Sequence, residues 1–289
     1  EYICIYFCET DFAFLILKKI LNSSSLGTSS NLPFILIGSY EKSMGTWSRL
    51  VGNKFIEWLS PQPKKEWLDV GCGNGAFSEL IIGNGAPSRL VGIDPSPEQI
   101  KFASERGLGP AATFDVGDAM HLSLNDDEFD LAVMALVIFF LTDPSRGLSE
   151  MTRVVKAGGT IASYAWDAVN KGSPSSLISG HLSDMGYKPD SPPNPQVSEM
   201  TTLRALWSSA CIMEITSFPI TVERSFKNID EYWAISSLFP NIQNIIPALT
   251  DKEIEELKQR LESSLEAYPD GGLVQRATAN AIKGFVMKS

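Results

Sequence analysis

The chain has 289 residues, of which 44% are hydrophobic and 20% are charged, and its formal net charge is −10 at pH 7. This composition is typical of a globular protein with a sizeable buried core. The negative charge argues against broad binding to nucleic acid or to an anionic membrane, because both require a concentrated basic surface. The four cysteines are scattered without CxxC spacing, so we expect a cytoplasmic protein without a metal site.

The first 39 residues differ from the rest of the chain. Residues 2–21 are apolar, but acidic and basic residues interrupt them before the run reaches the about 20 residues of a membrane span. No basic region precedes this run, which argues against a signal peptide. We therefore expect residues 1–39 to be a poorly specified extension and residues 40–289 to form the functional domain.

From Lys65 onward, apolar runs of strand length alternate with helical patterns, which indicates βαβ units and a parallel sheet. Ser96-Pro97 and Asp143-Pro144 each combine a helix N-cap with a proline at the first helical position. The segment 172–195 is rich in Pro, Gly and Ser, and such composition is typical of an irregular, mobile segment over a site. We predict strands at 66–70, 89–93, 113–116, 129–140, 160–166, 212–218 and 275–285, and later helices at 203–210 and 251–266.

The loop Asp69–Gly75 connects the first predicted strand to the first predicted helix of this region. Its glycines let the backbone approach a ligand closely. Gly71, Gly73 and Ala76 also satisfy the dinucleotide fingerprint G-x-G-x-x-G/A, and Asp94 follows about 20 residues later, as that fingerprint requires. The loop alone therefore leaves a nicotinamide-dependent oxidoreductase as an alternative.

Two acidic residues favour a different ligand. Asp69 comes two residues before the first glycine, where a carboxylate would repel a pyrophosphate but suits a cationic ligand with an α-amino group. Asp118 follows the third predicted strand, where it can accept a hydrogen bond from an adenine amino group. Together with Asp94, they place three acidic residues at three successive strand ends. This set fits a positively charged nucleoside.

These motifs resemble the class I S-adenosylmethionine (SAM) dependent methyltransferases, and more narrowly a bacterial-type group related to the ubiquinone/menaquinone-biosynthesis methyltransferases. The resemblance extends from about Tyr40 to Phe285. It implies a Rossmann-like α/β fold with a doubly wound seven-stranded sheet, mostly parallel with an antiparallel last strand, and helices on both faces. The further matching segments are Tyr40–Trp47, Ala135–Asp143, Val155–Gly159, Tyr164–Asp167 and Ala277–Gly284.

The same resemblance implies SAM as the cofactor, S-adenosylhomocysteine as the product, and one cofactor site. The methionine part of SAM would contact the glycine loop and the end of the fourth strand. The ribose would contact the end of the second strand, and the adenine would contact the end of the third strand. Asp94 would accept hydrogen bonds from both ribose hydroxyls, as a carboxylate can. The implied contacts of the methionine part are Asp69, Gly71, Cys72, Gly73, Ala135 and Leu136. Those of the ribose are Asp94 and Pro95, and those of the adenine are Asp118, Ala119 and Met120.

The acceptor side is less specified. Tyr40, Trp47 and Trp166 are candidates to line it, although packing explains each of them equally well. Asp167 and His181 are candidate bases, but SN2 transfer from a sulfonium requires none, because in-line positioning and desolvation supply much of the acceleration. We expect a lid or substrate segment at about 168–200 and a helical insertion at about 228–267.

The sequence therefore predicts a SAM-dependent methyltransferase that acts on a small-molecule acceptor, as a monomer or homodimer. The alternatives are a nicotinamide-dependent oxidoreductase of Rossmann type and a SAM-binding protein without catalytic turnover.

Overall fold

The computed structural model describes residues 41–268 and 272–288, so the predicted extension 1–39 and Tyr40 lie outside the described residues. Contacts within the chain group it into two compact units. The larger unit consists of Trp47–Ser173, Pro192–Glu223 and Arg276–Ser289. The smaller unit consists of Pro174–Ser191 and Arg224–Gln275, together with the described residues up to Thr46. Across the described ranges, no helix has both the length and the apolarity of a membrane span.

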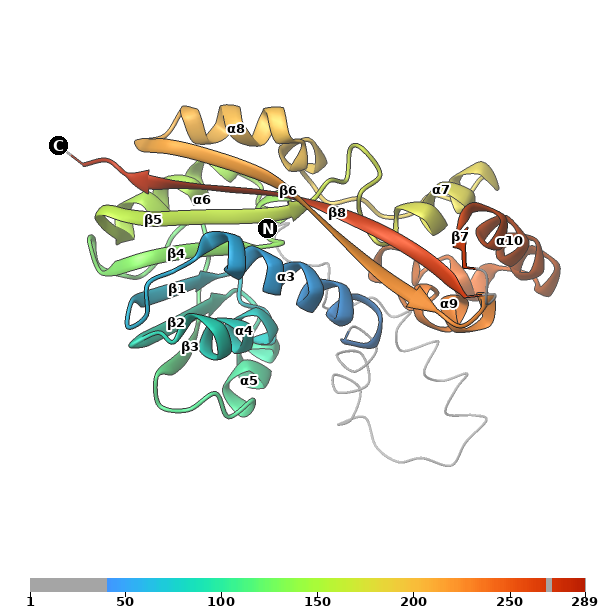
Figure 1. Ribbon diagram of the computed structural model, residues 1–289, viewed down its shortest axis with the longest axis horizontal. Coiled ribbons are helices and arrows are strands. Elements are labelled where there is room, and N and C mark those ends of the chain that lie inside the picture. The colour runs from blue at the N-terminus through green and yellow to red at the C-terminus, as the bar shows by residue number, and fades with distance from the viewer. Residues whose placement is uncertain (1–40, 269–271, 289) are drawn as a thin grey trace. The chain divides into compact units, whose positions relative to one another are not determined.

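The strands form a sheet in the order β3-β2-β1-β4-β5-β8-β6 (Figure 1). The strands β1 to β5 pair in parallel, and β8 pairs antiparallel with β5, so the predicted mostly parallel sheet with an antiparallel last strand is confirmed. A short additional strand, β7, pairs with β8. The bounds are β1 Glu66–Val70, β2 Arg89–Asp94, β3 Ala112–Val116, β4 Phe129–Ala135, β5 Val155–Trp166, β6 Ile212–Phe226, β7 Glu266–Ala267 and β8 Leu273–Val286.

Helices flank the strands of the larger unit, and the alternation of side chains along a strand decides which residues face which helices. In β1, Leu68 and Val70 belong to the same buried cluster as Leu148 and Met151 of α6 (Pro144–Val154), the helix that precedes β5. Asp69 points to the opposite face, where it meets α4. The helices of this unit are α3 Thr46–Leu59, α4 Ala76–Gly85, α5 Pro97–Glu105, α6 Pro144–Val154 and α8 Met200–Ser208, with short 3-10 turns η3 Ile138–Phe140 and η4 Pro195–Ser198.

Both predicted helix starts are confirmed. The Ser96 hydroxyl accepts a hydrogen bond from the backbone N–H of Gln99 (3.3 Å), and α5 begins at the following proline. The Asp143 carboxylate accepts from the backbone N–H of Arg146 (3.0 Å), and α6 begins at Pro144. Each cap satisfies a backbone donor that the helix itself leaves without a partner. The first of these caps, Ser96, comes two residues after Asp94, the last residue of β2.

Several predicted boundaries are wrong, including the end of the strand expected at 212–218, which continues to Phe226 as β6. The strand expected at 129–140 ends at Ala135, because Leu136 takes a left-handed conformation (φ 63°) and a 3-10 turn follows. The pattern after Asp143-Pro144 predicts a helix that ends near Lys156, with Gly158 and Gly159 as its C-terminal stop; the helix instead ends at Val154, and β5 begins at Val155. The sequence pattern missed this helix end because the register between β4 and β5 shifts near Phe129, and Gly158 (φ 73°) lies inside the strand.

The smaller unit contains α7 Ser176–Asp184, α9 Ile229–Ser236 and α10 Asp251–Ser264, together with a π-helical turn η2 Glu41–Gly45 and 3-10 turns η5 Pro240–Ile242 and η6 Ile246–Ala248. The expectation that 172–195 is irregular is wrong for α7. Ile178 and Leu182, four residues apart, bury one face of this helix completely. The Tyr187 hydroxyl donates to the Glu253 carboxylate (2.8 Å), which ties the residues after α7 to α10. The predicted charged helix is confirmed as α10.

Candidate functional site

The loop between β1 and α4 is fastened to the end of β2. The backbone N–H groups of Gly71 and Cys72 both donate to the carbonyl of Ile93, at 2.7 and 3.0 Å. A Cβ atom on Gly71 would lie 2.4 Å from a methyl group of Val137, so packing excludes any side chain there. A Cβ atom on Gly73 would meet no atom within 4 Å. The backbone of Gly73 therefore borders open space, as close approach of a ligand requires.

Asp69 is fully buried beneath this loop. Its Oδ2 accepts a hydrogen bond from the Ser78 hydroxyl of α4 (2.6 Å), whereas its Oδ1 has no partner among the residues that the structure describes. Burial raises the pKa of Asp69 to about 7; the charge of Asp94 adds to this shift and the Ser78 hydrogen bond opposes it. A buried acceptor without a partner is costly, and a cationic donor would satisfy it.

Asp94 ends β2 beside the same loop. Its Oδ2 accepts from the backbone N–H of Gly73 and its Oδ1 from that of Ser96, each at 3.0 Å. Burial raises the pKa of Asp94, and these two hydrogen bonds act against the increase. The carboxylate is thus held at the loop in a fixed orientation. Because Asp94 also raises the pKa of Asp69, the structure brings two of the three predicted carboxylates together.

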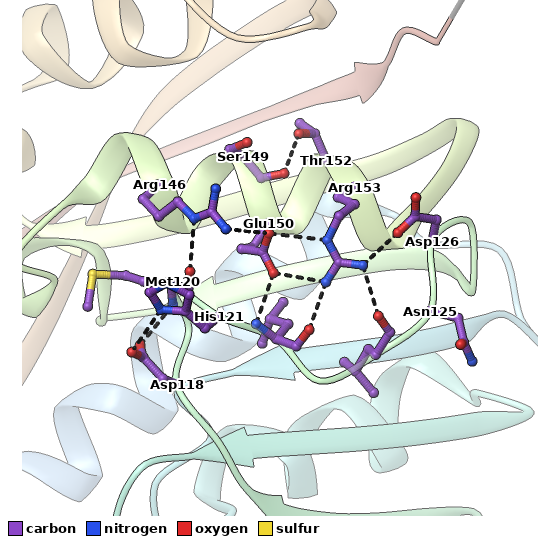
Figure 2. Close-up of polar contacts among 12 residues, drawn as sticks. Asp118, Met120, His121, Asn125, Asp126, Arg146, Ser149, Glu150, Thr152 and Arg153 are labelled. Atoms are coloured by element: carbon purple, nitrogen blue, oxygen red, sulfur yellow. Dashed lines mark hydrogen bonds and ion pairs between the residues drawn. The ribbon is translucent and has the colours of Figure 1, made fainter.

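The third carboxylate, Asp118, follows β3, the neighbour of β2 in the sheet. Gly117, the residue before Asp118, is bonded to the end of β2, because its backbone N–H donates to the carbonyl of Asp94 (3.0 Å). Asp118 Oδ1 accepts from the backbone N–H of Met120 (2.8 Å), and Oδ2 lies 3.5 Å from His121 Nδ1 (Figure 2). The side chain of Asp118 is 41% exposed.

The residues that follow these carboxylates have different surroundings. Cys72 is buried, and its pKa is raised by burial and by the charges of Asp69 and Asp94, so its thiol stays protonated. Pro95 is exposed, whereas Ala119 and Met120 are buried.

At the end of β4, Ala135 and Leu136 are half-buried. The left-handed backbone of Leu136 is held by a hydrogen bond from its N–H to the carbonyl of Tyr164 (2.8 Å). A non-glycine residue in this conformation costs on the order of 1 kcal/mol, and such strain is concentrated at functional sites. The strained residue lies where the predicted methionine-side contact was placed.

Three of the residues predicted on the acceptor side lie in the larger unit. Trp47 and Trp166 are buried in the larger unit, and the indole N–H of each has no partner among the described residues. The carboxylate of Asp167 closes a turn, because it accepts from the backbone and side-chain nitrogens of Asn170 (3.2 and 3.1 Å). These contacts give all three side chains a packing or turn-forming role within the larger unit.

His181 belongs to the smaller unit. Its Nε2 lies 3.0 Å from the Ser264 hydroxyl, at the end of α10. Burial lowers the pKa of His181, Arg260 lowers it further and Asp184 opposes the change. The imidazole is therefore neutral at pH 7. Its described contacts join α7 to α10.

One group of residues beside the site was not anticipated. Arg146, Glu150 and Arg153 project from α6 toward the loop after β3 and bind its backbone (Figure 2). Their spacing of four and three residues places them on one helix face. That spacing was visible in the sequence, but it is also the ordinary pattern of a surface ion pair.

Residues 68–163 match a family described as methyltransferase domain. The match runs from β1 into β5 and includes Asp69, Asp94 and Asp118. Over this range the chain is similar to methyltransferase domains. The remaining residues, before and after this range, lie outside the match.

Curated relatives with the name methyltransferase are similar to part of this chain. A demethylmenaquinone methyltransferase of Bacteroides fragilis is 35% identical over 118 residues, which are 39% of this chain and 46% of that protein. Ajmaline N-methyltransferase of Rauvolfia serpentina is 38% identical over 113 residues, which are 37% of this chain and 38% of that protein. The chain thus spans less than half the length of these two relatives.

A structure of phosphoethanolamine N-methyltransferase 2 of Haemonchus contortus, in complex with phosphomonomethylethanolamine and S-adenosylhomocysteine, matches the fold with a TM-score of 0.55. The two proteins share 16% identity over 87% of this chain and 57% of the other. The fold class predicted from the sequence is confirmed. The nicotinamide-dependent alternative receives no support from these matches.

Proposed function

We propose that the protein transfers a methyl group from SAM to a small organic acceptor. The observation that carries this proposal is the fully buried Asp69, whose Oδ1 lacks a partner among the described residues and whose pKa is raised to about 7. A dinucleotide would bring a pyrophosphate to this loop and would be repelled. An ammonium group would instead donate to Oδ1 and stabilise the ionised carboxylate.

The described residues fit the rest of the cofactor. Asp94 presents a fixed carboxylate for two hydroxyl groups, since each of its oxygens retains a lone pair beyond its single backbone hydrogen bond. The partly exposed carboxylate of Asp118 can accept a hydrogen bond from an amino group. The open space at Gly73 allows a ligand to approach the backbone of the loop. In support of this choice, S-adenosylhomocysteine is bound in a protein of the same fold.

When bound, SAM supplies a methyl group that its sulfonium has already activated for SN2 displacement. The chain then has to hold the donor, exclude water and align the acceptor. The protonated Cys72 thiol does not compete as a nucleophile, because burial and two nearby carboxylates disfavour its thiolate. Asp167 and His181 remain the candidate bases for an acceptor that must lose a proton.

We further propose that the segment 168–200 makes the acceptor contacts. It lies outside the matched range 68–163. The relatives that share this range carry names with different acceptors, demethylmenaquinone and ajmaline, which indicates that acceptor choice depends on other parts of the chain. Hydrogen exchange with the identified acceptor should slow in this segment. Slowing confined to 68–163 would contradict this assignment.

Calorimetry with SAM, S-adenosylhomocysteine and NAD tests the cofactor. We expect binding of the first two and none of NAD; the reverse would overturn the proposal in favour of the oxidoreductase. A labelled-methyl screen against small metabolites then tests turnover. Binding of SAM without transfer to any acceptor would instead indicate a non-catalytic SAM-binding protein.

A further inference from the structure

Side chains of α6 hold the loop after β3 by its alternate carbonyl groups. Arg146 Nε donates to the carbonyl of Met120 (3.1 Å), and Arg153 donates through Nη2 to Leu122 (2.7 Å) and through Nη1 to Leu124 (2.9 Å) (Figure 2). Bonds to alternate carbonyls resemble the pairing of a strand, with two arginines in place of a neighbouring backbone. The loop is therefore fixed over five residues by a helix that contains none of the predicted cofactor contacts.

A buried carboxylate fixes both arginines. Glu150 is 5% exposed, and it accepts from Arg153 Nη2 (2.8 Å) and Arg153 Nε (3.1 Å) and from the backbone N–H of Leu122 (2.9 Å). Arg146 Nη2 lies 3.5 Å from the same carboxylate. The hydrogen bonds from Arg153 lower the pKa of Glu150 despite its burial, so the group is ionised at neutral pH. A bidentate arginine–carboxylate pair of this kind has a defined geometry.

Arg146 is linked to Asp118 through one residue. Met120 is held on both sides, because its N–H donates to Asp118 Oδ1 (2.8 Å) and its carbonyl accepts from Arg146 Nε (3.1 Å). The bond from Met120 occupies one oxygen of Asp118 and so determines where the other oxygen points. Loss of the bond to the Met120 carbonyl removes one of the two restraints on this residue, so its N–H is held less firmly against the Asp118 carboxylate.

We propose that Arg146 is a positioning residue for recognition of the adenine 6-amino group, acting through Met120 on Asp118. This inference rests on the proposed function, since it requires that Asp118 accept from that amino group. Arg146 is suited to a test because its side chain is 48% exposed, so its replacement removes a hydrogen bond without opening a cavity. Arg153 is less suitable, because it contacts Glu150 and three further groups.

The test compares two ligands that differ at the 6-position of the base. S-adenosylhomocysteine carries the amino group there, whereas S-inosylhomocysteine carries a carbonyl oxygen, which would face the carboxylate. We expect the wild-type protein to prefer the first by about tenfold in Kd, the low end for a hydrogen bond to a charged group. In Arg146→Met the preference should fall to about twofold, mainly through weaker binding of the adenosine ligand.

Two further variants complete the design. Arg146→Lys retains the charge beside Glu150 without the guanidinium geometry, and it should show an intermediate preference. The matched control is Arg89→Met, which removes an arginine of 39% side-chain exposure that pairs with Glu66 and Glu128 at the amino end of β2. It should retain the wild-type preference. Thermal unfolding checks that each variant is folded.

The possible outcomes are distinct. An undiminished preference in both Arg146 variants, or an equal loss of affinity for both ligands, would overturn the role of Arg146. Equal binding of the two ligands by the wild-type protein would also overturn it, because Asp118 would then not distinguish the amino group. Failure of the wild-type protein to bind either ligand would contradict the proposed function itself.

Discussion

The two ends of the parallel strands in the larger unit use charged residues in opposite ways. At the amino end, Lys156 lies 2.8 Å from Glu66 and 3.2 Å from Asp130, and Arg89 pairs with both Glu66 and Glu128. At the carboxyl end, Asp69 of β1 and Asp94 of β2 have no such cation among the described residues; their hydrogen-bond partners are a hydroxyl and backbone N–H groups.

The pKa shifts follow this difference. At the amino end, the hydrogen bond from Arg89 lowers the pKa of Glu128, and hydrogen bonds from the Glu66 N–H and Lys156 lower that of Asp130 although burial opposes them. At the carboxyl end, burial raises the pKa of Asp69 and of Asp94. The amino-end charges stabilise one another, whereas the carboxyl-end charges leave a deficit that a cationic ligand can fill.

The largest expected effect distinguishes the two ends directly. Asp69→Asn should weaken S-adenosylhomocysteine binding by about 100-fold, because a charge-assisted hydrogen bond to the ligand's amino group is lost. Its counterpart, Asp130→Asn, should leave the affinity unchanged and lower the Tm, since it removes the charge that pairs with Lys156 and leaves one acceptor oxygen for Lys156 and the Glu66 N–H together. Calorimetry and thermal unfolding measure the two effects. Equal losses of affinity would contradict the proposed division between the ends.

The second prediction concerns pH. With a folded pKa of about 7, Asp69 is increasingly protonated below that pH and can no longer pair with an ammonium group. S-adenosylhomocysteine affinity should therefore fall as the pH drops below 7, approaching about tenfold per pH unit. Calorimetry between pH 5.5 and 8 measures this. Asp69→Asn, which cannot titrate, should show a flat profile; the same slope in that variant would exclude Asp69 as its source.

Stability without ligand should show the opposite trend for the same group. The folded pKa of Asp69 lies above its ordinary value of 3.8, so the folded state binds the proton more tightly than the unfolded state. Its burial therefore costs nothing below pH 3.8 and becomes more destabilising as the pH rises through about 7. In urea unfolding, the stability of Asp69→Asn relative to wild type should increase between pH 4 and pH 7.

Substitutions of Gly71 and Gly73 in the loop should have smaller effects. Gly71→Ala should destabilise the fold by more than about 2 kcal/mol, because its Cβ would overlap Val137 in addition to straining the backbone. Gly73→Ala has open space for its Cβ and should cost about 1 kcal/mol through its left-handed conformation alone. That methyl group would occupy the space assigned to the ligand, so affinity should fall. Unchanged affinity would place the ligand elsewhere.

The smallest effect is expected at the amino end. Lys156→Met removes two ion pairs of a side chain that is 40% exposed, and such pairs contribute less than about 1 kcal/mol each. Its Tm decrease should shrink at high salt. Ligand affinity should not change, and a change would show that the two ends are coupled.

Much of the fold followed from local patterns. Strand runs and helix caps depend on neighbours within a few residues, so the starts of α5 and α6 at Ser96 and Asp143 were predictable. The ends of β4 and α6 were not, because the left-handed turn at Leu136 depends on a hydrogen bond to Tyr164 and the start of β5 depends on pairing with β4. The helix α7 was missed because Pro, Gly and Ser around it concealed the burial of Ile178 and Leu182.

By itself, the sequence determined that acidic residues follow three successive strands, and hence the chemistry that the site can offer, because a strand end and its next few residues are local features. Only the tertiary structure decided which carboxylates have a cationic partner. Asp130 meets Lys156, 26 residues away, whereas Asp69 is buried against a hydroxyl and has one oxygen left without a partner among the described residues. The tertiary structure also places Arg146 beside the carbonyl of Met120, 26 residues earlier. Charge pairing across such separations depends on how layers pack, which no local pattern encodes.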